Sequence, residues 1–235
     1  MDRALLNAEV LKAVLEDSWS EADVRRAIEY ATRGDGKIPR TSPRLPRDLI
    51  ETLQRERLLA GMLRATAELG YRHMNVQHVI ERASVSRPTF YEYFKNKEDC
   101  FLMAFDTAAI RLRNRIETAV EESQGREDRL RLGTEALMSF AVDEPDAART
   151  LIVEARCASA EAVLRREKLL NHFAACVEEL GAHPSDDSPA ARSTVATDGI
   201  VGGIDAVLFG RLSEDRLDGL QALLPSLMRF AAAPA

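Results

Sequence analysis

The chain has 235 residues, of which 46% are hydrophobic and 30% charged, and its formal net charge is −6 at pH 7. This length allows two compact cores, because domains most often hold about 100–150 residues, and the composition is that of an ordinary globular protein. The sequence shows neither an apolar run near the roughly 20 residues that a membrane span needs nor the apolar block of a signal peptide, so we expect a cytoplasmic protein that does not enter a membrane.

Residues typical of catalysis or metal binding are sparse. Cys100, Cys157 and Cys176 lie far apart, which argues against a disulfide framework or a zinc site and favours small apolar core residues. The four histidines have no partner at a spacing suited to metal binding or nucleophilic catalysis. Phosphate-binding loops and the HExxH and GxSxG motifs are also missing from the sequence. We therefore expect no enzyme, no cofactor and no metal.

Charge is distributed unevenly along the chain. Residues 37–97 hold twelve Lys and Arg against six Asp and Glu, a local charge of +6, whereas the remainder holds 20 bases and 32 acids and carries −12. Neutralisation of phosphates supplies most of the non-specific affinity for DNA, so this asymmetry favours a basic DNA-binding module joined to an acidic partner domain. Chance clustering on a solvated helix face is the alternative.

The residue pattern predicts an all-α protein, because apolar residues recur at helical spacing without a sustained alternation of β-branched residues. Helices are expected at residues 3–16 and from Ser20 to about Thr32. Residues 37–47 then carry three prolines and four basic residues, which excludes regular helix. This stretch is either a solvated tether or an arm for the DNA minor groove. We expect residues 1–47 to form a helical extension and basic linker of undefined role.

The next segment shows the strongest local signals. A long helix is expected at residues 48–69 and is closed by Gly70, after which Asn75 caps a short helix at residues 76–83. Residues 84–86 form a turn, and Pro88 lies in the first turn of a helix ending at Phe94. Asn96 caps a further helix that runs to about Glu122.

Two short helices separated by three residues are typical of a helix-turn-helix unit. In such a unit the first helix and the long preceding helix hold the second helix so that its N-terminal residues meet base edges. The expected core consists of Val79, Ile80, Ala83, Val85, Phe90 and Phe94, covered by Leu59, Met62 and Leu63. We place this DNA-binding domain at residues 48–100.

Residues 65–71 (ATAELGY) and 75–98 (NVQHVIERASVSRPTFYEYFKNKE) resemble the tetracycline-repressor (TetR) family of bacterial one-component regulators. The resemblance covers about fifty residues. Two positions depart from the family pattern: Asn75 replaces the usual Thr or Ser, and Ser84 replaces a usual Gly. Asn can cap a helix as Thr does, whereas Ser makes a left-handed turn somewhat more costly than Gly does.

The resemblance implies DNA contacts that the residue types can make. Arg87 can form two hydrogen bonds to guanine, and Thr89 and Pro88 can touch a thymine methyl group. Tyr91, Tyr93 and Lys97 are expected at phosphates, although aromatic residues at helical spacing are more often core. For His78, an ordinary surface position is the favoured alternative to a contact with DNA. The complete expected set is Gln77, His78, Ser86, Arg87, Pro88, Thr89, Tyr91, Tyr93, Lys95 and Lys97.

Residues 101–235 are expected to form a helical domain for effector binding and dimerisation, as the resemblance implies. Its expected helices are residues 127–142, 145–157, 160–180, 189–212 and 213–230. Pocket candidates, where polar and apolar types mix, are Met138, Phe140, Arg156, Cys157, His172, Phe173 and Cys176. Dimer candidates, for which an internal core is the alternative, are Gly199, Gly202, Gly203, Leu217, Leu220, Leu224 and Leu227.

The sequence thus predicts a homodimeric, sequence-specific regulator that binds a double-stranded DNA operator in a bacterial nucleoid. A repressor released from its operator by an unknown small-molecule effector is the expected form. The alternative is a helical protein-interaction module without DNA binding.

Overall fold

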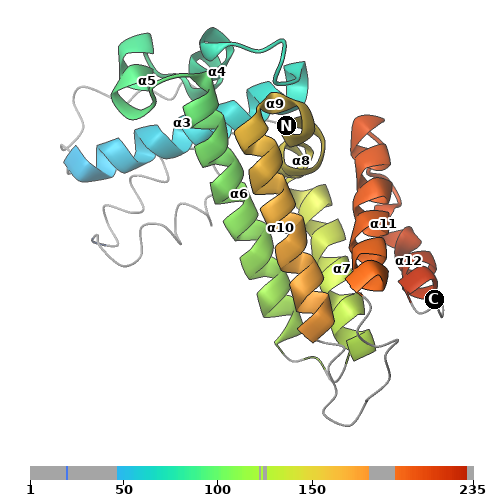
Figure 1. The fold of residues 1–235 in the computed structure, drawn as a ribbon. Coiled ribbons are helices and arrows are strands. Elements are labelled where there is room, and N and C mark those ends of the chain that lie inside the picture. The colour runs from blue at the N-terminus through green and yellow to red at the C-terminus, as the bar shows by residue number, and fades with distance from the viewer. Residues whose placement is uncertain (1–19, 21–46, 122, 124–125, 180–193, 232–235) are drawn as a thin grey trace. The chain divides into compact units, whose positions relative to one another are not determined.

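The computed structural model describes residues 20, 47–121, 123, 126–179 and 194–231, and in these ranges the regular structure is entirely helical (Figure 1). The chain divides into two compact units, residues 1–104 and 105–235. The all-α prediction is confirmed, whereas the helices expected before residue 33 and the basic linker lie outside the described residues, apart from Ser20 and Arg47. None of the described helices is long and apolar enough to cross a membrane.

The N-terminal unit is built on the long helix α3 (Arg47–Leu69), against which α4 (Val76–Ala83) packs. Helix α5 (Arg87–Tyr93) follows, and α6 (Lys97–Val120) begins in this unit. The core contains the residues that the sequence placed there, with the exception of the half-buried Val85. Those that are buried are Leu59, Met62, Leu63, Val79, Ile80, Ala83, Phe90 and Phe94.

Side-chain caps fix where these helices begin. The Asn75 side chain accepts hydrogen bonds from the backbone N–H groups of Gln77 (2.9 Å) and His78 (3.3 Å), and the His78 ring accepts one from the Asn75 N–H. Ser86 caps α5 by accepting from the Thr89 N–H (3.2 Å), and Asn96 caps α6 by accepting from the Asp99 N–H (2.9 Å). The predicted caps at Asn75 and Asn96 are confirmed, and they satisfy donors that a helix start leaves free.

Helices α3 and α4 approach each other closely at Gly61. A Cβ atom added there would lie 2.8 Å from the Val79 carbonyl oxygen and 3.1 Å from the Ala83 Cβ. Only glycine fits this crossing without a shift of backbone. Arg57 lies on the same helix and donates to the Ser84 carbonyl oxygen (3.1 Å), which joins α3 to the turn between α4 and α5. Ser84 itself adopts the left-handed conformation (φ 51°), as the usual glycine of the family pattern suggested.

The C-terminal unit contains the remainder of α6, α7 (Arg126–Asp143), α8 (Pro145–Arg149), α9 (Ala155–Ala158), α10 (Ala160–Glu179) and α11 (Thr194–Ser213). Within it, α10 runs beside the C-terminal part of α6 and also contacts α11 (Figure 1). Ion pairs tie α6 to its neighbours: Asp106 binds Arg165 of α10, Arg111 binds Glu144 (2.8 Å), and Arg115 binds Asp143 of α7. The segment expected as one helix at residues 145–157 contains a π-helical turn, Thr150–Glu154, between α8 and α9.

The expected continuous helix at residues 213–230 is wrong in its first half. Helix α11 ends at Ser213, a 3-10 turn covers Leu220–Leu223, and α12 (Leu224–Ala231) begins only then. Asp215 (φ 53°) and Gly219 (φ 71°) adopt left-handed conformations, which end a right-handed helix. The turn allows Leu220 to be buried, and the 3-10 segment contacts α7.

Candidate nucleic-acid interface and ligand cavity

The N-terminal end of α5 presents the residues that the sequence assigned to base recognition. Ser86, Arg87 and Pro88 are exposed and Thr89 is half-buried, while Phe90 below them is fully buried and anchors the helix in the core. The Ser86 hydroxyl lies 2.8 Å from the Thr89 hydroxyl in addition to capping the helix. Ser86 therefore positions the helix start, which leaves Arg87 and Pro88 as the outermost groups.

A chain of polar side chains links α4 to Arg87. The Arg87 guanidinium donates to the Gln77 amide oxygen (3.3 Å), and the Gln77 amide nitrogen donates to the Glu81 carboxylate (2.9 Å). Both expected DNA-contacting residues, Gln77 and Arg87, are exposed and lie next to each other although ten positions apart. Gln77 can thus orient Arg87 as well as meet DNA itself. His78 is held within the cap of α4 and is half-buried.

The four remaining candidates divide into exposed and engaged side chains. Tyr91 (51% exposed) and Lys95 are on the surface, as a phosphate contact requires. Tyr93 is half-buried, and its hydroxyl donates to Gln54 of α3 (3.0 Å).

Lys97 is tied to the protein itself. Its ammonium donates to the carbonyl oxygens of Tyr71 (2.9 Å) and Met74 (3.1 Å) and lies 4.0 Å from the centre of the Tyr71 ring. Burial lowers the pKa of this ammonium. Lys97 therefore holds the segment after α3 against the start of α6, a role that the sequence did not reveal.

A cavity of about 260 Å³ lies within the C-terminal unit. Each long helix lines it with one face, because the lining residues of α7, α10 and α11 recur three and four positions apart. The apolar lining residues are Leu112, Ile116, Val120, Leu130, Leu137, Leu151, Ile152, Leu169, Leu170, Phe173, Cys176, Val201, Ile204 and Leu208. Gly133, Thr134, Glu117, Arg129, Arg166 and Asp205 complete it.

Of the seven residues that the sequence suggested for the pocket, Phe173 and Cys176 line the cavity. Met138 and Phe140 are buried but lie off the cavity-lining face of α7, and Arg156, Cys157 and His172 are exposed and do not line it. Searching for mixed polar and apolar residue types therefore identified only two of the cavity-lining residues. The apolar stripe of α10, which Arg166 interrupts, would have been a better signal for the cavity lining.

The dimer candidates also fall into two groups. A Cβ added at Gly199 or Gly202 would meet no described atom within 4 Å, whereas one at Gly203 would lie 2.9 Å from the Phe230 ring. Leu220 and Leu227 are buried inside this chain, and Leu217 and Leu224 are half-buried. The open glycines of α11 are the candidates that remain available to a second chain.

Comparison with known proteins also relates the N-terminal unit to bacterial regulators. Residues 58–104 match the family model of bacterial regulatory proteins of the tetR family. The HTH-type transcriptional activator FasR of Mycolicibacterium smegmatis is 28% identical over 101 residues, which cover 43% of this chain and 44%, less than half, of that protein.

Two solved structures share the fold. The regulator FadR of Bacillus subtilis, solved in complex with stearoyl-CoA, has a TM-score of 0.67 and 22% identity, covering 76% of this chain and 98% of that one. A TetR-like regulator from Rhodococcus sp. RHA1 has a TM-score of 0.64 and 17% identity, covering 81% and 100%.

The tripod of α3, α4 and α5, with an exposed arginine at the start of α5, has the arrangement of a helix-turn-helix unit of the kind that DNA-binding regulators use. The matched residues 58–104 cover the second half of α3, all of α4 and α5, and the start of α6. Over these residues the chain is similar to bacterial regulators of the TetR family.

Proposed function

We propose that this protein is a homodimeric repressor that reads a near-palindromic operator with Arg87 and is released from it by an apolar effector. The exposed Arg87, backed by the buried Phe90, is the single observation that carries the DNA-reading part. An arginine at the start of a recognition helix can form two hydrogen bonds to guanine, which contributes about 1–3 kcal/mol of discrimination. Operator release follows if the effector prefers a conformer with a different head spacing.

Selection of bound duplexes from a random pool tests the operator reading, because it reports the site, its symmetry and its half-site spacing together. Arg87→Ala should lose the sequence preference while it keeps salt-sensitive binding to unrelated duplex. Lys95→Ala is the matched control, since it removes an exposed charge and should weaken binding to all sequences alike. An unchanged selected sequence with Arg87→Ala would refute the assignment of Arg87. Failure of the chain to bind duplex at low salt would favour a protein-interaction module instead.

The glycine face of α11 supports self-association. Gly199, Gly202 and Gly210 each cost about 1 kcal/mol of helix stability relative to Ala, and an added Cβ at any of them would meet no described atom within 4 Å. Such positions make sense if a second chain approaches closely, and the exposed Phe230 of α12 lies over the same helix at Gly203. We infer a dimer surface centred on α11.

Sedimentation at several protein concentrations tests the dimer. Gly202→Glu should give a folded monomer with much weaker operator binding, because it places a charge at the centre of the surface. A Gly202→Glu dimer of unchanged stability would show that α11 is not the interface.

The cavity supports an apolar, chain-like effector, since fourteen of its twenty lining residues are hydrophobic. The FadR structure that shares the fold was solved with stearoyl-CoA, whose stearoyl chain is apolar. Repression is the sign that we propose, although the FasR relative is named as an activator. Transcription in vitro from the selected operator, with and without added decanoic acid or stearoyl-CoA, tests both statements. A rise in transcript on adding the purified protein would make it an activator.

A further inference from the structure

The four charged residues that line the cavity differ in how far they are exposed to solvent. Glu117 and Arg129 are exposed, whereas Arg166 is only 6% exposed and the Asp205 side chain 14%. Placing a guanidinium among apolar side chains costs free energy unless it is paired. Hydrophobic packing alone does not require Arg166 at this position of α10.

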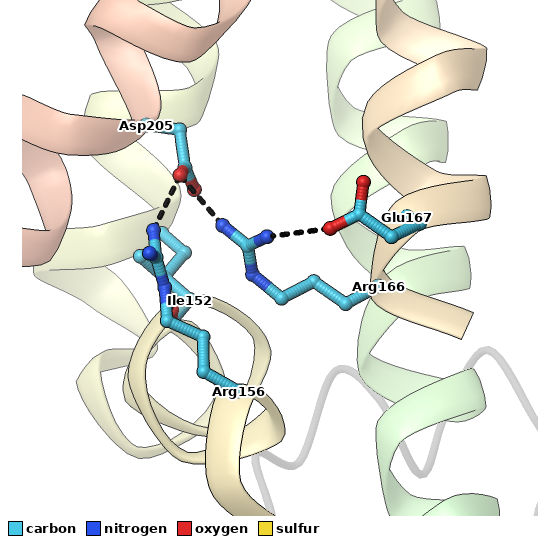
Figure 2. Close-up of polar contacts among 5 residues, drawn as sticks. All are labelled: Ile152, Arg156, Arg166, Glu167 and Asp205. Atoms are coloured by element: carbon cyan, nitrogen blue, oxygen red, sulfur yellow. Dashed lines mark hydrogen bonds and ion pairs between the residues drawn. The ribbon is translucent and has the colours of Figure 1, made fainter. Parts of the chain in front are cut away.

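Two arginines converge on one carboxylate oxygen (Figure 2). Asp205 of α11 accepts from Arg166 of α10 (2.6 Å) and from Arg156 of α9 (2.5 Å), both at Oδ2. Arg156 is also held independently of Asp205. Its Nε donates to the Ile152 carbonyl oxygen (2.9 Å) in the π-helical turn, and its guanidinium lies 4.3 Å from the centre of the Phe209 ring.

Arg166 has two acidic partners of unequal quality. Asp205 is shared, because its Oδ2 also accepts from Arg156. Glu167 accepts a longer hydrogen bond from Arg166 (3.4 Å), and its side chain is 55% exposed, so solvent weakens this second ion pair. A planar carboxylate can bind a guanidinium through two parallel hydrogen bonds, a stronger geometry than the shared oxygen of Asp205.

We propose that Arg166 binds the carboxylate of an aliphatic acid whose chain fills the cavity, an inference that rests on the proposed effector role of this cavity. The ligand carboxylate takes the place of Asp205 at Arg166, and Asp205 remains paired with Arg156. Because Arg166 lies on α10 and Asp205 on α11, this exchange breaks an ion pair between the two helices. Ligand binding thereby acts directly on α11, the helix proposed to form the dimer.

Calorimetric titration of the full chain with decanoic acid, decan-1-ol, methyl decanoate and decanoyl-CoA tests the head-group assignment. The four probes share one chain, and only decanoic acid presents a carboxylate at its end. We expect the acid to bind about ten- to a hundredfold more tightly than the other three, the usual difference for a charge-assisted hydrogen bond. Equal affinities, or tighter binding of decanoyl-CoA, would overturn the proposal.

Two substitutions separate recognition from a merely structural role. Arg166→Met keeps much of the side-chain volume and should abolish the preference for the acid over the alcohol. Asp205→Asn removes the competing carboxylate and should tighten decanoic acid binding. Glu135→Gln, the matched control on α7, removes an exposed carboxylate that pairs with Arg131 outside the cavity lining and should bind decanoic acid as the original chain does. Weaker acid binding by a folded Asp205→Asn variant would contradict the exchange, and if a variant does not fold, the four-probe series decides.

Direct binding and operator release are measured separately. Tight, acid-selective binding without any change in operator affinity would leave Arg166 as the anion receptor and refute release by this effector. Absence of binding by all four probes would overturn the receptor assignment, while the DNA-reading role of Arg87 would still be decided by duplex selection alone.

Discussion

Gly61→Ala tests the packing that sets up the recognition helix. In an open helix this change stabilises by about 1 kcal/mol, because alanine has the higher helix propensity. At Gly61 the new methyl group would lie 2.8 Å from the Val79 carbonyl oxygen and 3.1 Å from the Ala83 Cβ. Neither atom can move by rotating a side chain, so α3 and α4 must separate by a few tenths of an ångström.

Overpacking of this kind costs about 1–3 kcal/mol, and contact with backbone places the cost near the upper end. After subtraction of the propensity gain, we expect a net destabilisation of about 2 kcal/mol. Urea unfolding followed by circular dichroism measures this change. The operator affinity of the folded variant should also fall, because α5 follows α4 and moves with it.

Gly133→Ala is the matched control, because its Cβ would meet the Ile116 and Val120 side chains at 3.6 and 3.7 Å, which is ordinary contact. This variant should be as stable as the original chain or more stable by up to about 1 kcal/mol. A Gly61→Ala protein that is also stabilised would refute the close approach of α3 and α4.

Three further outcomes follow from single residues. Ser84→Gly should stabilise the chain by about 0.5–1 kcal/mol in thermal unfolding, because glycine adopts the left-handed φ of 51° without the cost that serine bears; a loss of stability would contradict the turn geometry. Iodoacetamide should modify the exposed Cys157 in the folded protein but reach Cys100 only on unfolding. Cys100 is buried, and burial raises the pKa of its thiol well above 9.0, so little reactive thiolate forms. Rapid labelling of Cys100 at pH 8, measured by peptide mass spectrometry, would be inconsistent with this core. Burial raises the pKa of Asp106 above its ordinary value of 3.8 despite the ion pair with Arg165, so folding disfavours the ionised carboxylate. The protonated side chain therefore contributes stability that is fully present below pH 3.8 and is lost as the pH rises through the higher pKa of the folded state. Urea midpoints of Asp106→Asn relative to the original chain should therefore improve between acidic and neutral pH, and the opposite trend would show that the ion pair dominates.

Local signals made the N-terminal unit readable from the sequence. Capping depends on residues within three positions of each other, so Asn75, Pro88 and Asn96 could be assigned to helix starts without any knowledge of tertiary contacts. The order of these signals also predicted the helix-turn-helix unit, and the structure confirmed its core at Phe90 and Phe94.

Signals that depend on distant partners were missed. The carbonyl oxygens of Tyr71 and Met74 accept hydrogen bonds from Lys97 although these residues precede it by more than twenty positions, so no local sequence pattern predicts the contacts. The close approach of Gly61 to α4 could not be predicted from the sequence for the same reason. Periodicity continued through residues 214–219, where the structure turns at Asp215 and Gly219. Helical propensity reports what a segment does alone, and such a turn is decided by what the chain packs against afterwards.

The amino-acid sequence by itself determined the helical class, the helix starts of the DNA-binding unit and the identity of its exposed arginine, because each depends on neighbours along the chain. The tertiary structure decided which face of each C-terminal helix lines the cavity and that Arg166 and Arg156 share Asp205. Both features depend on the rotation of each helix about its axis relative to its neighbours. The packing of many side chains together determines that rotation, so no short stretch of sequence specifies it.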